Sequence, residues 1–263
     1  MVTIIRGIQD NIAERCREFE QEPLTHTLFL NSVPKSGTHL IRNVIRMFVP
    51  PEQHFHREFI QIPNLKRCAD AFGSEKRYVS WGHLLFSDDS VIALGDARHI
   101  IMVRDPYDWV LARARFFLSD EFQGNLNHIK NGAVPAEELL NMMILGVHAK
   151  APSLLDIYMF NAAAWTGTRA VIVRFEDMVE AVKDLDSRRA EAFFLKLFAD
   201  CGLDAPDDWR ARVRIGSDRG QSRTARENLT LPSTVAIPDL LPDDQKRLVD
   251  FHAPGLRAML GYA

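Results

Sequence analysis

The stretch LFLNSVPKSGTHLIRNVIRMF, residues 28–48, decides the expected fold of this 263-residue chain. It opens with an apolar run typical of a buried strand, passes through a turn of small residues, and continues with apolar residues at helical spacing. The amide groups and the dipole at a helix N-terminus favour negative charge. The stretch therefore predicts an anion-binding, P-loop-like connection between a strand and a helix, although it lacks the Gly-x-x-x-x-Gly-Lys-Ser/Thr spacing of nucleotide triphosphatases.

The side chains of this turn suit an anion. Lys35 supplies a compact positive charge, Gly37 permits close approach of the backbone, and Thr38 adds a hydroxyl group. Short Gly-Ser-Thr turns are also common as plain connections in which the lysine is solvated. The turn by itself leaves both interpretations open.

The rest of the chain predicts an α/β fold. Further apolar strands are expected within residues 76–84, 99–103 and 169–178, and helical patterns alternate with them. Such alternation indicates right-handed crossovers and a central, mainly parallel sheet with helices on both faces, a three-layer α/β/α arrangement. The segments PKSGTH, SWGHL and RDPYD each follow a strand, so we expect them to share one cleft at the carboxyl ends of the strands.

One domain is expected over residues 1–263, because this length suits one large α/β domain and is short for two. Residues 1–25 are expected to be a leading extension with a helix over 5–20. Residues 119–134 indicate a mobile loop, and the last helical segment is split by Pro254.

Composition and charge exclude several classes of partner. The formal net charge of -3 provides no global basic field for nucleic acid, and no segment approaches the roughly 18 apolar residues of a membrane span. Cys16, Cys68 and Cys201 are widely separated, which argues against a disulfide framework or a zinc site and fits a reducing cytoplasm. His54 and His56 lack a third ligand of metal spacing nearby. We expect a cytoplasmic protein with no membrane span, no nucleic-acid partner and no metal.

Several motifs together resemble those of the sulfotransferase family. PKSGTHL at residues 34–40 is similar to the family's 5′-phosphosulfate loop, and RDPYDWVLARARFF at residues 104–117 is similar to its 3′-phosphate signature. VIVRFEDM resembles a strand that ends in Tyr-Glu-Asp-Leu, DRGQSRTAREN is a weaker echo of the C-terminal Arg-Lys-Gly loop, and MLGY resembles a common ending. The matches keep the family's order along nearly the whole chain. The chain is therefore identified as a member of the PAPS-dependent sulfotransferase family.

The resemblance implies a co-substrate, 3′-phosphoadenosine 5′-phosphosulfate (PAPS), and the product 3′,5′-adenosine diphosphate (PAP). A sulfuryl group would move to a hydroxyl or an amine, and Lys35 would stabilise the departing oxygen. His83, just after the second strand, would be the general base, although a lone histidine is often a hydrogen-bonded structural residue. The implied donor-binding residues are Lys35, Ser36, Gly37, Thr38, His39, Arg104, Arg219 and Gly220.

Some positions leave alternatives open or depart from the family pattern. Arg104 is implied to grip the 3′ phosphate, because its fork of donors matches phosphate oxygens, but it could instead pair with Asp105 or Asp108. The departures from the family pattern leave Lys35 and His83 in place, but they remove groups that contribute to donor affinity in the family. They fall at His39, Leu40, Trp81, Ala112, Arg223 and Ala225.

The acceptor is not defined by these motifs. The resemblance allows a small molecule, a carbohydrate or glycan, or a lipid, with residues 118–150 as an acceptor-side lid. Family members often dimerise, which leaves a homodimer open. Two other classes remain as alternatives: a P-loop small-molecule kinase, whose lysine would follow the loop glycine, and a non-catalytic module of the same fold that binds PAPS or PAP.

Overall fold

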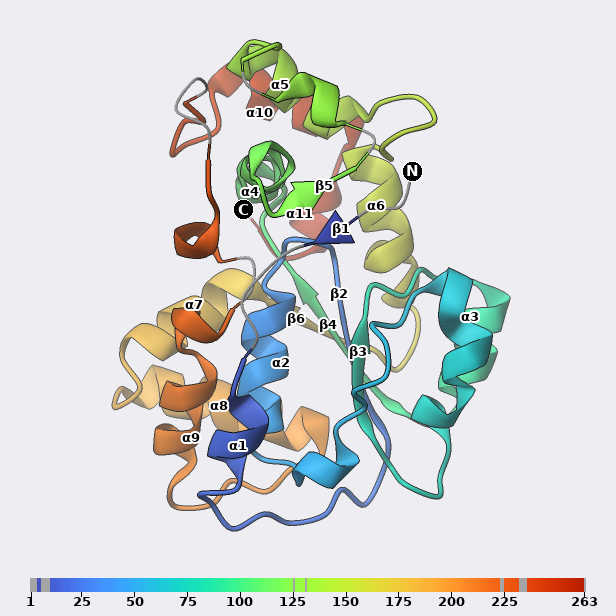
Figure 1. Cartoon of the computed structure of the whole chain (residues 1–263), viewed down its shortest axis with the longest axis vertical. Helices are drawn as coiled ribbons and strands as arrows, with labels where there is room; N and C mark the ends of the chain where they lie inside the picture. The colour runs from blue at the N-terminus through green and yellow to red at the C-terminus, as the bar shows by residue number, and fades with distance from the viewer. Residues whose placement is uncertain are drawn as a thin grey trace.

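A parallel sheet of four strands, in the order β3-β2-β4-β6, lies at the centre of the molecule (Figure 1). The structure is a computed structural model, and it describes residues 4–5, 10–124, 126–130, 132–222, 225–231 and 236–262. The strands are β2 (Leu28–Ser32), β3 (Val79–Gly82), β4 (Arg98–Val103) and β6 (Val171–Arg174). The predicted α/β fold with a parallel sheet is confirmed.

Alternate side chains of the strands enter two separate cores, because successive residues of a strand point to opposite faces of the sheet. Phe29 of β2 and Ile101 of β4 belong to one buried cluster. Leu30 of β2 and Ile100 of β4 belong to the other. Both faces of the sheet are therefore buried, which explains why β2 and β4 read as continuous apolar runs.

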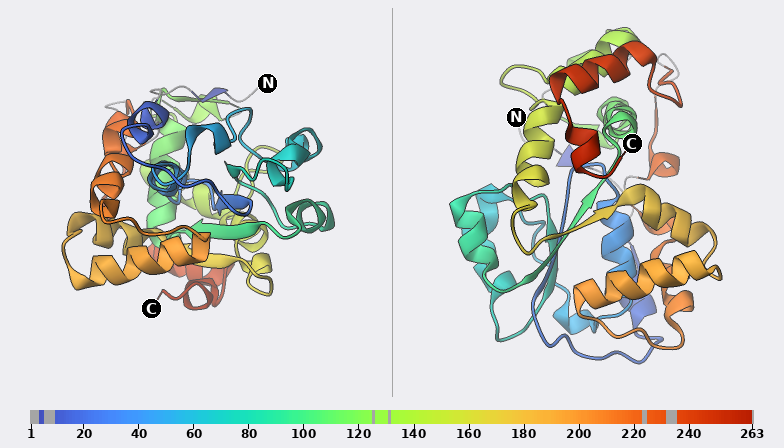
Figure 2. Two further views of the ribbon diagram at one scale, coloured as in Figure 1. Left: turned by 90° about the horizontal axis from the view of Figure 1, so that it is seen from below. Right: turned by 180° about the vertical axis from the view of Figure 1, so that it is seen from behind.

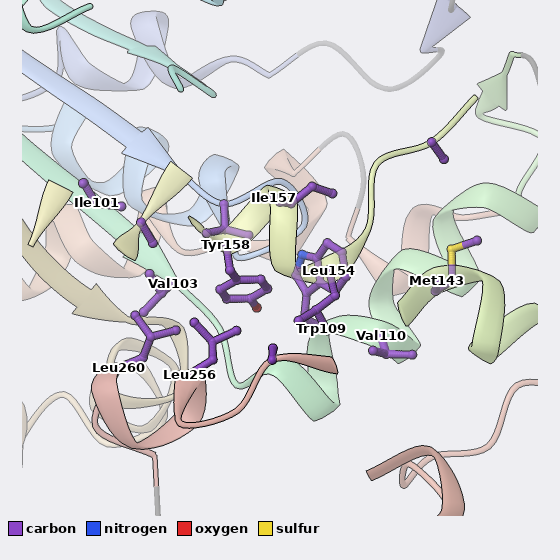
Figure 3. Close-up of a cluster of buried hydrophobic side chains, with 14 of the residues drawn as sticks. Ile101, Val103, Trp109, Val110, Met143, Leu154, Ile157, Tyr158, Leu256 and Leu260 are labelled. Carbon is purple, nitrogen blue, oxygen red and sulfur yellow. The ribbon is translucent and has the colours of Figure 1, made fainter. Parts of the chain in front are cut away.

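Helices supply the outer layers of both cores (Figures 1 and 2). The core that contains Leu30 and Ile100 is completed by α1 (Ile12–Cys16), α2 (Thr38–Arg46), α7 (Phe175–Lys183), α8 (Arg188–Cys201) and α9 (Trp209–Gly216). The other is completed by α3 (Asp88–Leu94), α4 (Pro106–Leu118), α5 (Ala136–Leu145), α6 (Leu154–Asn161), α10 (Asp243–His252) and α11 (Leu256–Met259). Figure 3 shows part of this second core, where Trp109 of α4, Tyr158 of α6 and Leu256 of α11 gather near the end of β4.

Shorter elements connect these layers. A small antiparallel pair joins β1 (Ile4–Ile5) to β5 (Phe122–Gln123). The 3-10 helices are η1 (Pro51–Gln53), η2 (Ile62–Phe72), η3 (Asn127–Ile129), η4 (Ala163–Trp165), η5 (Arg219–Gln221) and η6 (Arg226–Asn228).

The main departures from the sequence expectations lie outside the sheet. The leading helix expected over residues 5–20 is only the five residues of α1, and β1 precedes it. The expected loop over residues 119–134 contains β5 and η3. Helix α9 was not expected at all. The break at Pro254 is confirmed, since α10 ends at His252 and α11 begins at Leu256.

Candidate active site

The loop after β2 has an unusual backbone. Lys35 has a φ of 68° and Gly37 a φ of 95°, both in the left-handed region, which is costly for a lysine. The amide of Val33 donates to the carbonyl of Met102, and the indole N–H of Trp109 donates to the carbonyl of Pro34. These bonds to β4 and α4 hold the loop in its tight conformation.

Gly37 is the N-cap residue of α2 and cannot be replaced without a clash. A Cβ atom there would lie 2.4 Å from Cδ2 of Phe175, the first residue of α7. The ring of Phe175 also lies 4.7 Å from the guanidinium carbon of Arg104. One aromatic ring thus packs against both the loop and the arginine that follows β4.

The loop offers hydrogen-bond donors to an anion. Among the described residues, the amide N–H groups of Gly37 and Thr38 donate to no partner, and the fully buried hydroxyl of Ser36 makes no hydrogen bond. The amides of Ser36 and Leu40 are already used, since they donate to the carbonyls of Val33 and Gly37. Ser36 can therefore contribute its hydroxyl but not its amide. Unused donors at a helix N-terminus fit a phosphate group.

The side chain of Lys35 is largely enclosed by the protein. Its Nζ lies 4.0 Å from the centre of the Phe116 ring on α4. Burial, together with the positive charge of Arg104, lowers the pKa of Lys35 to about 7. An approaching anion would restore the charged form, so the amine is suited to act where negative charge arrives or develops.

His83 follows β3 and faces the same loop. Its Nδ1 lies 2.8 Å from the carbonyl oxygen of Ser32, which can only accept, so Nδ1 carries the proton and Nε2 keeps its lone pair. Burial, partly opposed by this hydrogen bond, lowers the pKa of His83 to about 4. At neutral pH the imidazole is therefore uncharged. Among the described residues Nε2 makes no hydrogen bond.

Ser32 connects the histidine to the loop. Its hydroxyl oxygen lies 3.1 Å from Nδ1 of His83 and 2.6 Å from the hydroxyl oxygen of Thr38. The predicted loop and the predicted base are thus neighbours through the last residue of β2, as expected for segments that follow adjacent parallel strands.

Phe59 is a site residue that the sequence analysis missed. Its ring lies 4.6 Å from the imidazole of His83 in an edge-on arrangement. The backbone of Ile60 pairs with β3 beside it, and a Cβ on Gly82 would lie only 2.0 Å from the Ile60 carbonyl oxygen. The glycine between Trp81 and His83 was the available signal, since a glycine inside a strand often marks a close backbone approach.

Arg104 follows β4. Asp105, which could have paired with it, forms an ion pair with another arginine. Asp105 accepts from Arg257 at 3.0 Å and caps α4 through the amide of Tyr107. In the part of the chain that the structure describes, Arg104 forms no ion pair, and its buried Nε has no hydrogen-bond partner. Its guanidinium is thus suited to a phosphate.

The segment that contains η5 and η6 contacts α2, but the two residues expected to bind the donor have partners within that segment. Arg219 pairs with Glu227 at 2.8 Å, and the amide of Gly220 donates to Asp218. The loop contacts α2 through its neighbours, since Nδ2 of Asn43 donates to the carbonyl of Gln221. The departure noted at Arg223 lies outside the described residues.

Other candidate groups take structural positions. His54 is buried, its Nε2 lies 2.8 Å from the Val49 carbonyl, and burial lowers its pKa to about 3. Cys16, Cys68 and Cys201 are buried free thiols. Across the described ranges, no group of three or more His, Cys, Asp or Glu could hold a metal ion, and no helix has the length and apolar character to cross a membrane.

Comparisons with known proteins identify the class of fold. No family model matches the chain, and no curated protein matches it. The chain is similar to the solved structure of mouse sulfotransferase SULT7A1 complexed with PAP, with 18% identity and a TM-score of 0.54 over 96% of this chain and 93% of that one. It is also similar to retinol dehydratase in complex with androsterone and the inactive cofactor PAP, with 11% identity and a TM-score of 0.51 over 89% and 80%.

These similarities show that the chain has the sulfotransferase fold. The resemblance of its motifs is thereby confirmed at the level of the fold, over nearly the full chain. The low identities leave the donor, the reaction and the roles of individual residues to be argued from the site itself.

Proposed function

We propose that this protein is a sulfotransferase that moves a sulfuryl group from PAPS to a hydroxyl or amine of an acceptor. One observation carries the proposal. In a fold shared with two PAP-bound proteins, the amine of Lys35, in the loop after β2, and the uncharged imidazole of His83, directly after β3, come from adjacent strands.

Donor binding would use the groups with unused hydrogen-bonding capacity. The amides of Gly37 and Thr38 and the hydroxyl of Ser36 suit the 5′ phosphosulfate, with His39 beside them on the first turn of α2. Arg104 suits the 3′ phosphate, and Arg219 and Gly220 would have to leave their internal partners to join it.

The two candidate catalytic groups have complementary tasks. Nε2 of His83 would take the proton of the acceptor hydroxyl as its oxygen attacks the sulfur. The bond between sulfur and the bridging phosphate oxygen breaks, and the electron pair stays on that oxygen. Lys35, in its charged form, would stabilise this negative charge. The donor supplies the activated sulfuryl group, and the protein supplies position and charge.

The surroundings favour an acceptor with an apolar part next to its hydroxyl. The ring of Phe59 borders His83, and the ring of Phe116 borders Lys35. A small molecule or a carbohydrate or lipid with such a part would fit, and residues 118–150 would form the lid. A cytoplasmic location and a homodimer stay predictions.

Mass spectrometry of reactions with PAPS and a set of phenols, sterols, sugars and lipids tests the proposal. The expected product gains one sulfuryl group, and Lys35→Ala lowers the rate by about 10²- to 10³-fold, as for loss of a donor that stabilises developing negative charge. ATP with Mg²⁺ serves as a parallel donor. Turnover with ATP and none with PAPS would identify a kinase, and tight PAP binding without turnover would favour a binding module.

A further inference from the structure

The C-terminal residues lie directly against the segment that carries Arg104. In Figure 3, Leu256 and Leu260 lie beside Val103, the last residue of β4, and beside Tyr158. Gly261 then turns the chain with a φ of 81°, and its carbonyl accepts a hydrogen bond from Arg174. This turn brings the last described residue, Tyr262, to the start of α7.

One carboxylate connects Tyr262 to the backbone next to Arg104. The hydroxyl of Tyr262 donates to Oε2 of Glu176 at 2.7 Å, and Oε1 of Glu176 accepts from the amide of Asp105 at 3.1 Å. Tyr262 is only 8% exposed, and burial, with the charge of Glu176, raises its pKa far above the ordinary value. The phenol is therefore a permanent donor, and it restricts the orientation of the carboxylate.

Further bonds hold Arg104 and Asp105 from other directions. Arg257 of α11 grips the carboxylate of Asp105 with two bonds of 3.1 and 3.0 Å, and the hydroxyl of Tyr158 donates to the carbonyl of Arg104 at 2.8 Å. The peptide group between Arg104 and Asp105 is thus held at both its carbonyl and its amide. Its guanidinium, by contrast, rests on Phe175 with a buried Nε that has no partner among the described residues.

We propose that Tyr262 is a positioning residue for recognition of the donor's 3′ phosphate. Through Glu176 it holds the Asp105 peptide, and so it directs the side chain of Arg104 toward a phosphate on the ribose 3′ carbon. This inference rests on the proposed function, because it assigns the 3′ phosphate to Arg104. A firmly placed backbone keeps a binding arginine in its productive geometry, which is where supporting hydrogen bonds have their effect.

Calorimetric binding of two nucleotides to Tyr262→Phe tests the proposal. PAP carries the 3′ phosphate and adenosine 5′-monophosphate lacks it. We expect about a ten-fold weaker affinity for PAP, the scale of one lost hydrogen bond to a charged group, and an unchanged affinity for the monophosphate. An equal loss for both ligands, or no loss for either, would overturn the proposal, because a merely structural tyrosine does not select the 3′ phosphate.

Tyr107→Phe is the matched control. The hydroxyl of Tyr107 donates to the carboxylate of Asp250 on α10 at 2.7 and 2.8 Å, so this change also removes a phenol–carboxylate contact between the C-terminal helices and the rest of the fold, while it keeps the ring that lies 4.0 Å from the guanidinium carbon of Arg257. The ratio of the two affinities should stay at the wild-type value. A shift equal to that of Tyr262→Phe would count against the Glu176 link.

Two further measurements complete the test. If Tyr262→Phe does not fold, Glu176→Gln decides by the same criterion, since the amide has one acceptor oxygen where the carboxylate has two. If the wild-type protein binds PAP no better than the monophosphate, the proposed function and this inference both fail. If the wild-type protein prefers PAP but the variants lose affinity equally for PAP and the monophosphate, only this inference fails.

Discussion

At position 35 the backbone and the side chain both depart from what a lysine prefers. The φ of 68° is in the left-handed region, and the amine lies over the Phe116 ring with its pKa lowered to about 7. Such strain is tolerated where the surrounding structure requires it, and it concentrates at functional sites. The sequence motif predicted the identity of this residue. It could not predict the ring contact or the lowered pKa, because the ring belongs to α4 and the pKa reflects burial and the charge of Arg104, which are all distant in the chain.

The lowered pKa of Lys35 predicts how PAP affinity changes with pH. Binding of an anion favours the charged amine, so the pKa of Lys35 rises on binding. The contribution of this charge is complete below pH 7 and is lost as the pH rises through the higher pKa of the complex. We expect PAP affinity, measured by calorimetry, to fall steadily above pH 7.

Lys35→Arg is the control for this dependence. An arginine stays charged throughout this range, so its PAP affinity should be nearly constant above pH 7. An identical pH dependence in both proteins would show that another group is responsible.

His83 supports a separate prediction about transfer. The change His83→Asn keeps a donor for the Ser32 carbonyl but removes the Nε2 lone pair, so we expect the rate of transfer to fall by about 10²- to 10⁴-fold. PAP affinity should change little, because the imidazole forms hydrogen bonds only with Ser32 of β2 and with none of the described residues of the loop that would bind the donor. Near-normal turnover would show that another group removes the proton.

At the level of the elements, the ends of the strands were predictable and the packing around them was not. Apolar runs and breaker residues indicated the sheet, and the ends of β2, β3 and β4 carry the expected segments. Phe59 escaped prediction because the pairing of its neighbour Ile60 with β3 has no local signature beyond Gly82. The engaged amide of Ser36 escaped for a similar reason, since a motif does not show which donors a turn consumes.

Gly82→Ala should disturb this pairing. A Cβ at residue 82 would meet backbone atoms of Ile60, which cannot move aside as a flexible side chain would. We expect a loss of about 1–3 kcal/mol in the free energy of unfolding, measured with urea. Gly167→Ala is the control, because a Cβ there meets nothing within 4 Å, and its unfolding should be close to that of the wild type.

At the scale of the whole molecule, both ends of the chain are fastened to the sheet's helices by charged groups. Asp10 accepts from Arg42 and Arg46 of α2, and Arg257 pairs with Asp105 at the start of α4. The sequence analysis expected only a leading helix at the N-terminus. Pairs this far apart in the chain are invisible to local patterns, because either partner alone resembles an ordinary surface charge.

Asp10→Asn should destabilise the fold strongly. Although burial alone raises the pKa of Asp10, the charges of Arg46 and Arg42 lower it below its usual value. Removal of the carboxylate leaves two arginine side chains, 5% and 10% exposed, without their shared counter-charge. We expect a loss of about 3 kcal/mol in the free energy of unfolding.

Asp96→Asn is the comparison for this loss. Asp96 also pairs with an arginine, Arg169, but its side chain is 98% exposed. Its removal should change stability by less than about 1 kcal/mol, as is usual for exposed pairs. Equal losses in the two variants would contradict a special role for the N-terminal pair.

The strand order determines how far apart the candidate site segments begin. His83, Lys35 and Arg104 follow β3, β2 and β4, three consecutive strands of one sheet. The sheet places the ends of β3 and β4 one step of about 4.8 Å on either side of β2 and roughly 10 Å apart, and Lys35 lies in the turn that follows β2. The distance between these strand ends is set by the hydrogen bonds between the strands. Surface loops can therefore change in sequence and length without altering the spacing of these strand ends.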